Sequence, residues 1–250
     1  MRRHRSISSC KGERGVALLS ALVLMLALLL TGIASTRAAL QGARAAEHER
    51  DRVLALQMAH AALLDAQRDI EGGSAPASGR AAAFVEGNPD AFAADCRGGT
   101  PYQGLCARQD DSGQLAAALL DHDGPAVVFG AHTGNRFPDG AAGLPQEAPR
   151  YLIELMPPMA DDLLYRITTR GAGSLPGTVA ALQAYYRKPP GAAPGWRIAW
   201  RELGNWGELA AAARYASEGE GEGDGDGDSD SAGDGDGDGE GEGEGEGGRR

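Results

Sequence analysis

The chain has 250 residues, 42% of them apolar and 5% aromatic, which is enough for one globular domain with a modest core. Its formal net charge is -11, but the segment from Glu218 to Arg250 holds 14 carboxylates and two arginines, so the rest of the chain is close to neutral. Outside that segment there is no basic stripe with interleaved aromatic residues, which argues against a nucleic-acid partner.

The chain begins with a positively charged stretch followed by an apolar run. The first 14 residues contain five basic side chains, and Val16 to Ala34 then runs for 19 residues without a charge. Such a helix can span a bilayer of roughly 30 Å, and the positive flank places the N-terminus in the cytoplasm and the remainder outside it. A cleavable secretory signal is the alternative, with Gly32 and Ala34 as small residues before the cleavage site.

The segment after the apolar run continues the helical pattern. From Ser35 through Glu71 there is no proline and one glycine, so a single helix is predicted from Val16 to Glu71, ending at Gly72-Gly73. Its second half is amphipathic, with an apolar face predicted from three-four spacing and made of Val53, Leu56, His60, Leu63, Gln67 and Ile70. The charged residues of this half, Asp51, Asp65 and Asp69 among them, are expected mostly to face elsewhere.

The middle of the chain, from Gly72 to Arg150, is rich in Gly, Pro, Ala and Asp. Loops are predicted there, with a short helix at Gln114 to Leu120 and a short strand at Ala126 to Phe129. Nine residues separate Cys96 from Cys106, and outside the cytoplasm a disulfide between them would stabilise the fold by about 2 to 3 kcal/mol. Two reduced, buried thiols are the alternative, and Cys10 has no evident partner.

Three strands are predicted next, at Tyr151 to Leu155, Leu163 to Arg170 and Thr178 to Arg187, with turns at Pro157-Pro158 and Gly171-Ala172-Gly173. They form an antiparallel meander with one face covered by the amphipathic half of the long helix. Glu154 is expected either to be exposed or to pair with Arg166 or Arg170.

Three tryptophans follow the predicted meander, before and within a short helical stretch that ends near Tyr215. Trp196, Trp200 and Trp206 are expected to close the edge of the core, and an exposed contact patch is the alternative.

The C-terminal segment alternates Gly with Asp or Glu and is predicted to be disordered, because it has no residues for a core and its like charges repel. Calcium binding by these carboxylates is the competing interpretation. The apolar repeat position of calcium-binding nonapeptides and the helix pair of an EF-hand are both missing, so no cofactor is expected.

Several segments together resemble one family. Arg14-Gly15-Val16-Ala17-Leu18-Leu19, followed by the apolar helix, resembles the class III leader of type IV prepilins, which a membrane peptidase cuts between glycine and the next residue, here Gly15 and Val16. RDRVLALQMAHAALLDAQRDIEGG, ADC...GLC and PRYLIEL...YRITTRGAG...GTVAALQAYYRK are similar to PilX-type minor pilins. The resemblance covers roughly Arg14 to Lys188 and leaves out the tryptophan-bearing stretch and the tail.

The resemblance implies an α+β type IV pilin fold, with a long N-terminal helix packed on a small antiparallel sheet. Its expected parts are a leader (1–15), a transmembrane half-helix (16–34), an amphipathic half-helix (35–71), a periplasmic head (72–216) and a disordered tail (217–250). The implied partners are other major and minor pilins, the prepilin peptidase and the pilus assembly platform. The implied location is the inner membrane, single pass, and afterwards the extracellular pilus, with methylation of the new N-terminus.

One position departs from the pattern of major pilins. These have a glutamate at the fifth mature position, which neutralises the N-terminal amine of a neighbouring subunit, whereas the fifth residue from Val16 here is Ser20. An unpaired ammonium in an apolar core costs several kcal/mol, so a subunit without this carboxylate suits the first position of a filament, at its tip.

Residue patterns of catalytic sites are missing from the chain. There is no GxSxG, HExxH or P-loop motif, and His122, Asp123 and His132 lack a further ligand at fixed spacing, so neither an enzyme nor a metal site is expected. Besides the minor pilin, two functions are left open: a pseudopilin of type II secretion, and a secreted or membrane-tethered binding protein unrelated to pili.

Overall fold

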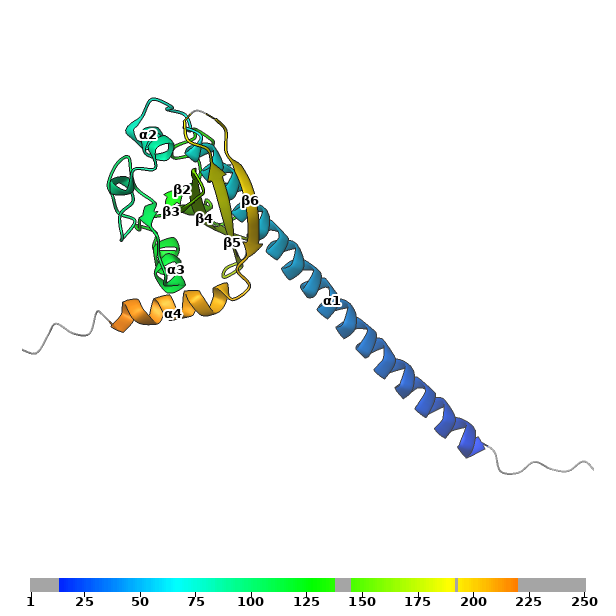
Figure 1. Cartoon of the computed structure of the whole chain (residues 1–250). Helices are drawn as coiled ribbons and strands as arrows, with labels where there is room; N and C mark the ends of the chain where they lie inside the picture. Colours follow the sequence, from blue (N-terminus) through cyan, green and yellow to red (C-terminus); the bar gives the residue numbers. More distant parts are fainter. Residues whose placement is uncertain (1–13, 138–144, 192, 220–250) are drawn as a thin grey trace, which may run out of the picture.

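The computed structural model describes residues 14–137, 145–191 and 193–219, and the leader up to residue 13, Cys10 and the acidic tail from residue 220 lie outside them. Within that part the chain is α+β, as predicted. A long N-terminal helix ends against a head built on a six-stranded sheet (Figure 1).

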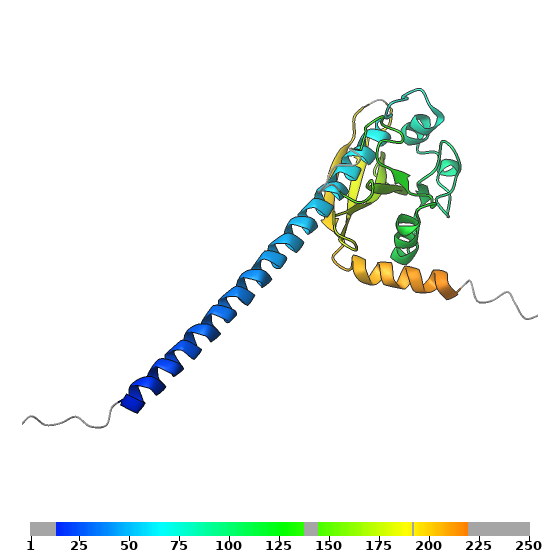
Figure 2. The same cartoon turned by 180° about the vertical axis from the view of Figure 1, so that it is seen from behind.

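The long helix α1 runs from Arg14 to Ile70, 57 residues without a break, which corresponds to about 85 Å. Its predicted limits are confirmed to within two residues. The helix stops where Gly72 and Gly73 adopt positive φ angles of 102° and 55°, a backbone conformation that favours glycine. Figure 2, seen from behind, shows that only the C-terminal part of α1 lies against the head.

The predicted buried face of α1 is confirmed only in part: Leu63 and Ile70 are buried, whereas Leu56, His60 and Gln67 are half-buried. The residues at the contact are mostly alanines and aspartates: Asp51, Ala55, Ala59, Ala62, Leu63, Asp65, Ala66, Asp69 and Ile70. Val53, which was predicted to belong to the buried face, is 43% exposed. Small side chains are selected because the sheet approaches the helix backbone closely. The Thr169 hydroxyl of the strand β4 (Asp162–Ala172) donates a 3.0 Å hydrogen bond to the Ala59 carbonyl.

Short elements connect α1 to the sheet. The helix α2 (Gly79–Glu86) begins at Ser78, whose hydroxyl accepts from the Ala81 amide (3.2 Å). The predicted helix before Leu120 is found as α3 (Ser112–Leu120), capped by Asp111, and the predicted strand near 127 is β2. The remaining elements of this region are η1 (Pro89–Ala91), β1 (Leu105–Ala107) and β2 (Val127–Val128).

The predicted meander is present and longer than expected. The antiparallel strands β3 (Arg150–Met159), β4 (Asp162–Ala172) and β5 (Val179–Lys188) are followed by β6 (Trp196–Glu202) and the helix α4 (Trp206–Gly219). The sheet order is β1-β3-β4-β5-β6, with β2 also pairing with β3.

Three details of the predicted sheet are corrected. The sheet is mixed, because β1 runs parallel to β3. Pro157 and Pro158 do not form the turn but lie inside β3, at a register irregularity between Met156 and Met159, where the strand needs no amide donors. The chain turns instead at Ala160, which has a φ of 56°. The second turn also lies later than predicted, since β4 continues through Ala172.

The sheet is covered on both faces. On one face α1 and α2 enclose the larger core around Phe84, Tyr151, Ile153, Tyr165 and Ile167. On the other face α3 and α4 pack with the Cys96–Cys106 region against Leu152 and Ala181. This second layer explains why Trp206, the first residue of α4, is 7% exposed, whereas Trp196 and Trp200 of β6 are 46% and 49% exposed. Core closure was therefore the wrong expectation for two of the three tryptophans.

Glu154 is fully buried on the second face. It is paired across the ladder with Arg166, whose Nε lies 2.7 Å from Glu154 Oε2, and its other oxygen accepts from the Gln109 amide. This confirms one of the two expected ion pairs, while Arg170 pairs with Glu147 instead.

We predict that Gly171→Ala destabilises the protein by about 1 to 3 kcal/mol, because a Cβ at this position would overlap the α1 backbone at Ala55, Met58 and Ala59. The control is Gly207→Ala in α4, where an added Cβ meets nothing within 4 Å. Urea unfolding of the detergent-purified chain measures both. Equal midpoints for Gly171→Ala and the unmodified chain would contradict the close packing of β4 on α1.

Candidate functional site

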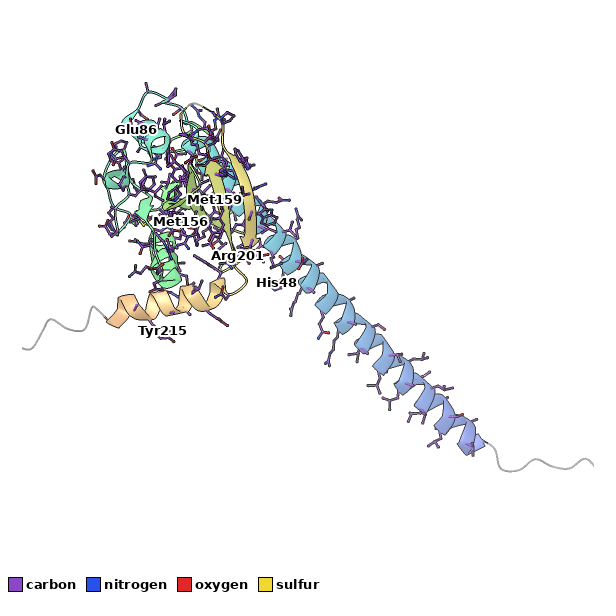
Figure 3. All side chains as sticks on the ribbon, in the orientation of Figure 1. His48, Glu86, Met156, Met159, Arg201 and Tyr215 are labelled. Carbon is purple, nitrogen blue, oxygen red and sulfur yellow. A yellow bond between two sulfur atoms is a disulfide. The ribbon has the colours of Figure 1, made fainter. Side chains whose placement is uncertain are left out.

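The N-terminal half of α1 presents an apolar surface without any contact to the head. Between residues 16 and 34 its large apolar side chains are 52% to 75% exposed. Figure 3 shows these side chains projecting from the helix with no other element beside them. This part of α1 is long and apolar enough to cross a membrane. Exposed apolar area of this extent requires lipid or other apolar helices around it.

The predicted cleavage position lies at the very start of this helix. Gly15 and Val16 are in its first turn, and an added Cβ at Gly15 would meet nothing within 4 Å. Ser20 is one turn further on, and its hydroxyl donates to the Ala17 carbonyl at 3.0 Å. This neutral side chain, which the resemblance aligns with the glutamate of major pilins, is therefore hydrogen-bonded within its own helix.

The second half of α1 contacts the head through carboxylates that the sequence pattern predicted to face mostly away from it. Asp51 is 4% exposed and lies under the β4–β5 connection. Its Oδ1 accepts from the Ser174 amide (2.6 Å) and hydroxyl (2.7 Å), and its Oδ2 from the Leu175 amide (3.2 Å). A buried carboxylate is tolerated only when it is hydrogen-bonded in this way.

Asp65 and Asp69 repeat this arrangement further along the helix. Asp65 accepts from the Gly130 amide (2.8 Å), the Thr133 hydroxyl and the Asn135 side-chain amide (2.6 Å), all in the loop after β2. Asp69 and its partner Arg80 form a buried pair.

The pair with Arg80 is bidentate. Arg80 Nε and Nη2 lie 2.9 and 2.7 Å from the two oxygens of Asp69, and the Tyr151 hydroxyl donates to the same carboxylate at 3.0 Å. Arg80 also donates to the carbonyls of Pro101 and Gln103, so it joins α1, α2 and the cystine region. Burial and the adjacent Asp69 charge raise the pKa of Tyr151, which keeps its hydroxyl protonated.

Glu71 follows α1 directly and adds a fourth carboxylate, whose side chain is 30% exposed. Its oxygens accept from the Tyr186 hydroxyl (2.9 Å), Lys188 Nζ (2.8 Å) and the Gly195 amide (3.0 Å). Burial alone would raise the pKa of Glu71, but the hydrogen bonds from Lys188, Gly195 and Tyr186 outweigh it and lower the pKa. Asp51, Asp65, Asp69 and Glu71, called the carboxylate row below, thus fix three loops and the end of β5 to one helix.

The predicted disulfide is confirmed. Cys96 and Cys106 are bonded, with 4.3 Å between their Cα atoms, and they belong to the core on the α3 side of the sheet. The bond holds the η1–β1 loop closed beside β3, at the end of the head opposite β6 in the sheet order.

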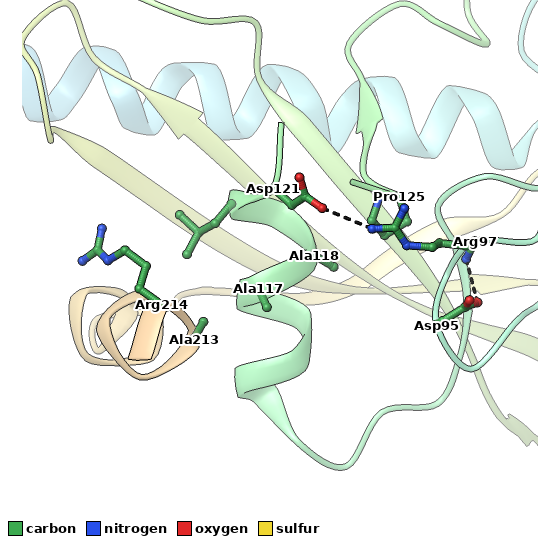
Figure 4. A pocket seen from close by; sticks show the side chains of 9 residues that line it. Asp95, Arg97, Ala117, Ala118, Asp121, Pro125, Ala213 and Arg214 are labelled. Atoms are coloured by element: carbon green, nitrogen blue, oxygen red, sulfur yellow. Dashed lines mark hydrogen bonds and ion pairs between the residues drawn. The ribbon is translucent and has the colours of Figure 1, made fainter. Parts of the chain in front are cut away.

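The hollow between α3 and α4 offers little chemistry. It has a volume of about 540 Å³ and is lined by three alanines, Leu120, Pro125 and four charged residues, Asp95, Arg97, Asp121 and Arg214 (Figure 4). Arg97 and Asp121 form an exposed ion pair, with 3.1 Å between nitrogen and oxygen. His122 Nε2 lies 3.7 Å from Glu147 Oε2. Among the described residues there is no group of three or more His, Cys, Asp or Glu side chains placed to hold a metal ion.

Comparisons with known protein families, with curated proteins and with solved structures find no match to this chain. A functional interpretation therefore depends on the bare apolar half-helix, the row of carboxylates that holds the head, and the leader-like residues at Gly15 and Val16.

We predict that Asp51→Asn lowers the free energy of unfolding at pH 7 by about 1 to 3 kcal/mol, because an amide presents its NH₂ donors to amides that need an acceptor. Burial would raise the pKa of Asp51, but hydrogen bonds from Thr178, Ser174 and Leu175 lower it below the usual 3.8. The stabilisation is therefore complete above pH 3.8 and is lost as the pH falls through the lowered folded-state pKa.

Urea unfolding at a series of pH values measures this effect, with the exposed Asp161→Asn as the matched control. The difference in free energy of unfolding between Asp51→Asn and the unmodified chain should become smaller as the pH falls below 3.8. A difference that is absent at neutral pH, or constant at every pH, would contradict the role of the carboxylate.

Proposed function

We propose that the chain is a minor pilin: a subunit that takes part in the assembly of a type IV pilus at or near its tip. The observation that carries the proposal is the division of α1 into two halves. One half is bare and apolar, and the other is fixed to a head by buried carboxylates.

This division suits a subunit that changes its surroundings. Before assembly, the bare half requires lipid around its apolar side chains. In a filament the same surface would be covered by the apolar helices of neighbouring subunits, with no need to unfold the head. The carboxylate row keeps the head and the helix in one orientation during the transfer, because breaking any of its buried contacts leaves a charge without partners.

The neutral residue at position 20 supports a place at the tip. A subunit inserted below another pilin has to meet that pilin's N-terminal ammonium, and Ser20 offers a hydroxyl that is already bonded to Ala17. The first subunit of a filament has no such amine above it. It therefore needs no carboxylate at this position, whereas later subunits do.

The cystine region around Cys96 and Cys106 and the YRITTRG hairpin resemble PilX-type minor pilins, and this resemblance favours the pilus over a type II secretion pseudopilin. The proposed partners are other pilins, the prepilin peptidase and the assembly platform of the inner membrane. No cofactor is proposed, and the function is one of assembly rather than catalysis.

We predict that the mature chain begins at Val16. The protein is recovered from membranes and from sheared surface filaments, and its N-terminus is determined by sequencing and intact mass. A Gly15→Leu variant, in which the peptidase loses its glycine, is expected to keep residues 1–15 and to be missing from filaments. A mature chain that begins at Ser35, or an uncut Met1, would contradict the pilin proposal.

A further inference from the structure

The two edges of the sheet differ in how they are covered. At the β1 edge, the chain itself supplies cover: the Ala93 amide donates to the Leu105 carbonyl (3.2 Å) and the Ala107 amide donates to the Ala93 carbonyl (2.9 Å). At the opposite edge, β6 pairs with β5 alone among the strands of the described residues. Every residue of β6 from Trp196 to Arg201 is exposed.

Main-chain groups of β6 point out of this edge. The Leu203 amide donates to the Ala181 carbonyl at 2.9 Å, and the register pairs Leu182 with Glu202. Hydrogen bonding in an antiparallel ladder alternates, so the amides and carbonyls of Glu202 and Trp200 face away from β5. These are the groups that an incoming strand would bond.

Exposed edges usually carry charged residues or bulges that discourage pairing, and β6 has two arginines and a register irregularity opposite Tyr185 and Tyr186. It differs from a protected edge in the large apolar side chains that stand between the arginines and beside them. Trp196, Ile198 and Trp200 are 46%, 41% and 49% exposed. Trp196 pairs with Arg187 in the ladder and Trp200 with Ala184, which places the two rings on opposite faces of the sheet. An added strand would thus meet an indole on each of its faces.

Both rings are already held in position. The Trp200 ring lies edge-on to His60 of α1 with 4.8 Å between ring centroids, and the Arg187 guanidinium lies over the Trp196 ring at 5.4 Å. Leu64, one helical turn after His60, is 61% exposed and extends the apolar surface onto α1. A preformed surface of this kind loses little side-chain freedom when a partner binds.

The charge of the edge specifies what would bind. Arg197 and Arg201 have no carboxylate partner among the described residues. Arg201, which is labelled in Figure 3 near the C-terminal end of β6, donates to the Gln183 side-chain oxygen (2.9 Å). Glu202 is already paired with Arg52, with 2.7 Å between nitrogen and oxygen. A strand that carries carboxylates and apolar side chains would complement this edge.

Two other occupants fit less well. A second copy of β6 would bring two further arginines against Arg197 and Arg201. The chain's own tail, from Glu218 onwards, supplies carboxylates but only one apolar residue, Ala232, to cover the tryptophans.

We infer that β6 is a docking edge at which an extended segment of a different protein, with alternating apolar and acidic residues, adds as a further strand of the sheet. This inference goes beyond the proposed function, because it depends on the head alone and holds whether or not the chain is part of a pilus.

The test is photo-cross-linking of the full chain in the cells that produce it. A benzoyl-phenylalanine probe replaces Ile198, and a control probe replaces Val128 of β2, which is 40% exposed. The cross-linked peptides are then sequenced. The probe at 198 is expected to join one extended, acidic segment of another protein, and the probe at 128 is not.

Charge reversal distinguishes specific docking at β6 from non-specific hydrophobic association. The double variant Arg197→Glu/Arg201→Glu, in a chain with an unchanged thermal midpoint, is expected to lower the yield of that adduct at least fivefold. The matched control, Arg108→Glu/Arg136→Glu, reverses exposed arginines away from β6 and is expected to leave the yield unchanged.

Adducts that map to a second β6, to the chain's own tail or only to lipid would overturn the inference. So would equal yields from the two probes, or a yield that the β6 charge reversal leaves unaltered.

Discussion

The contact between α1 and the head combines small side chains with buried carboxylates. Ala55 and Ala59 let β4 approach until Gly171 has no room for a Cβ, and this closeness excludes water from the contact. The carboxylate row then requires hydrogen-bond donors from the head. The loops that begin at Gly130 and Ser174 supply them at fixed places along the helix. Alanines alone would let the head slide along α1, whereas the carboxylates define one position.

This contact divides α1 into a part that is free of the head and a part that is packed against it. Head contacts begin at Asp51, so every described residue of α1 before it, from Gly15, is exposed. In the proposed minor pilin, lipid surrounds this part of α1 first, and neighbouring subunits surround it in the filament. The structure of the head, in which α3, α4 and the disulfide cover one face of the sheet, stays the same. The open β6 edge lies on the head and is independent of the bare half-helix, so a subunit at a tip could present it to another protein.

Sequence patterns predicted the elements better than their contacts. The limits of α1 followed from a run without proline between the basic N-terminal residues and Gly72-Gly73. The meander followed from the alternation of apolar and polar residues in its three segments. The buried face of α1 was predicted at Leu63 and Ile70 but missed elsewhere, because hydrophobic spacing favours large residues such as Val53, whereas a close helix–sheet contact selects alanine. The signal was present as Ala55, Ala59, Ala62 and Ala66. The burial of Asp65 could not be predicted, because its donors lie about 70 residues further along the chain.

In the proposed minor pilin, the neutral Ser20 confines the subunit to the tip of the filament. Immunogold labelling of an epitope in the head, on filaments from cells that produce either the unmodified chain or Ser20→Glu, tests this claim most directly. We expect label at one filament end for the unmodified chain, and label also along the filament for Ser20→Glu. Filaments without label, or the same distribution for both chains, would contradict it.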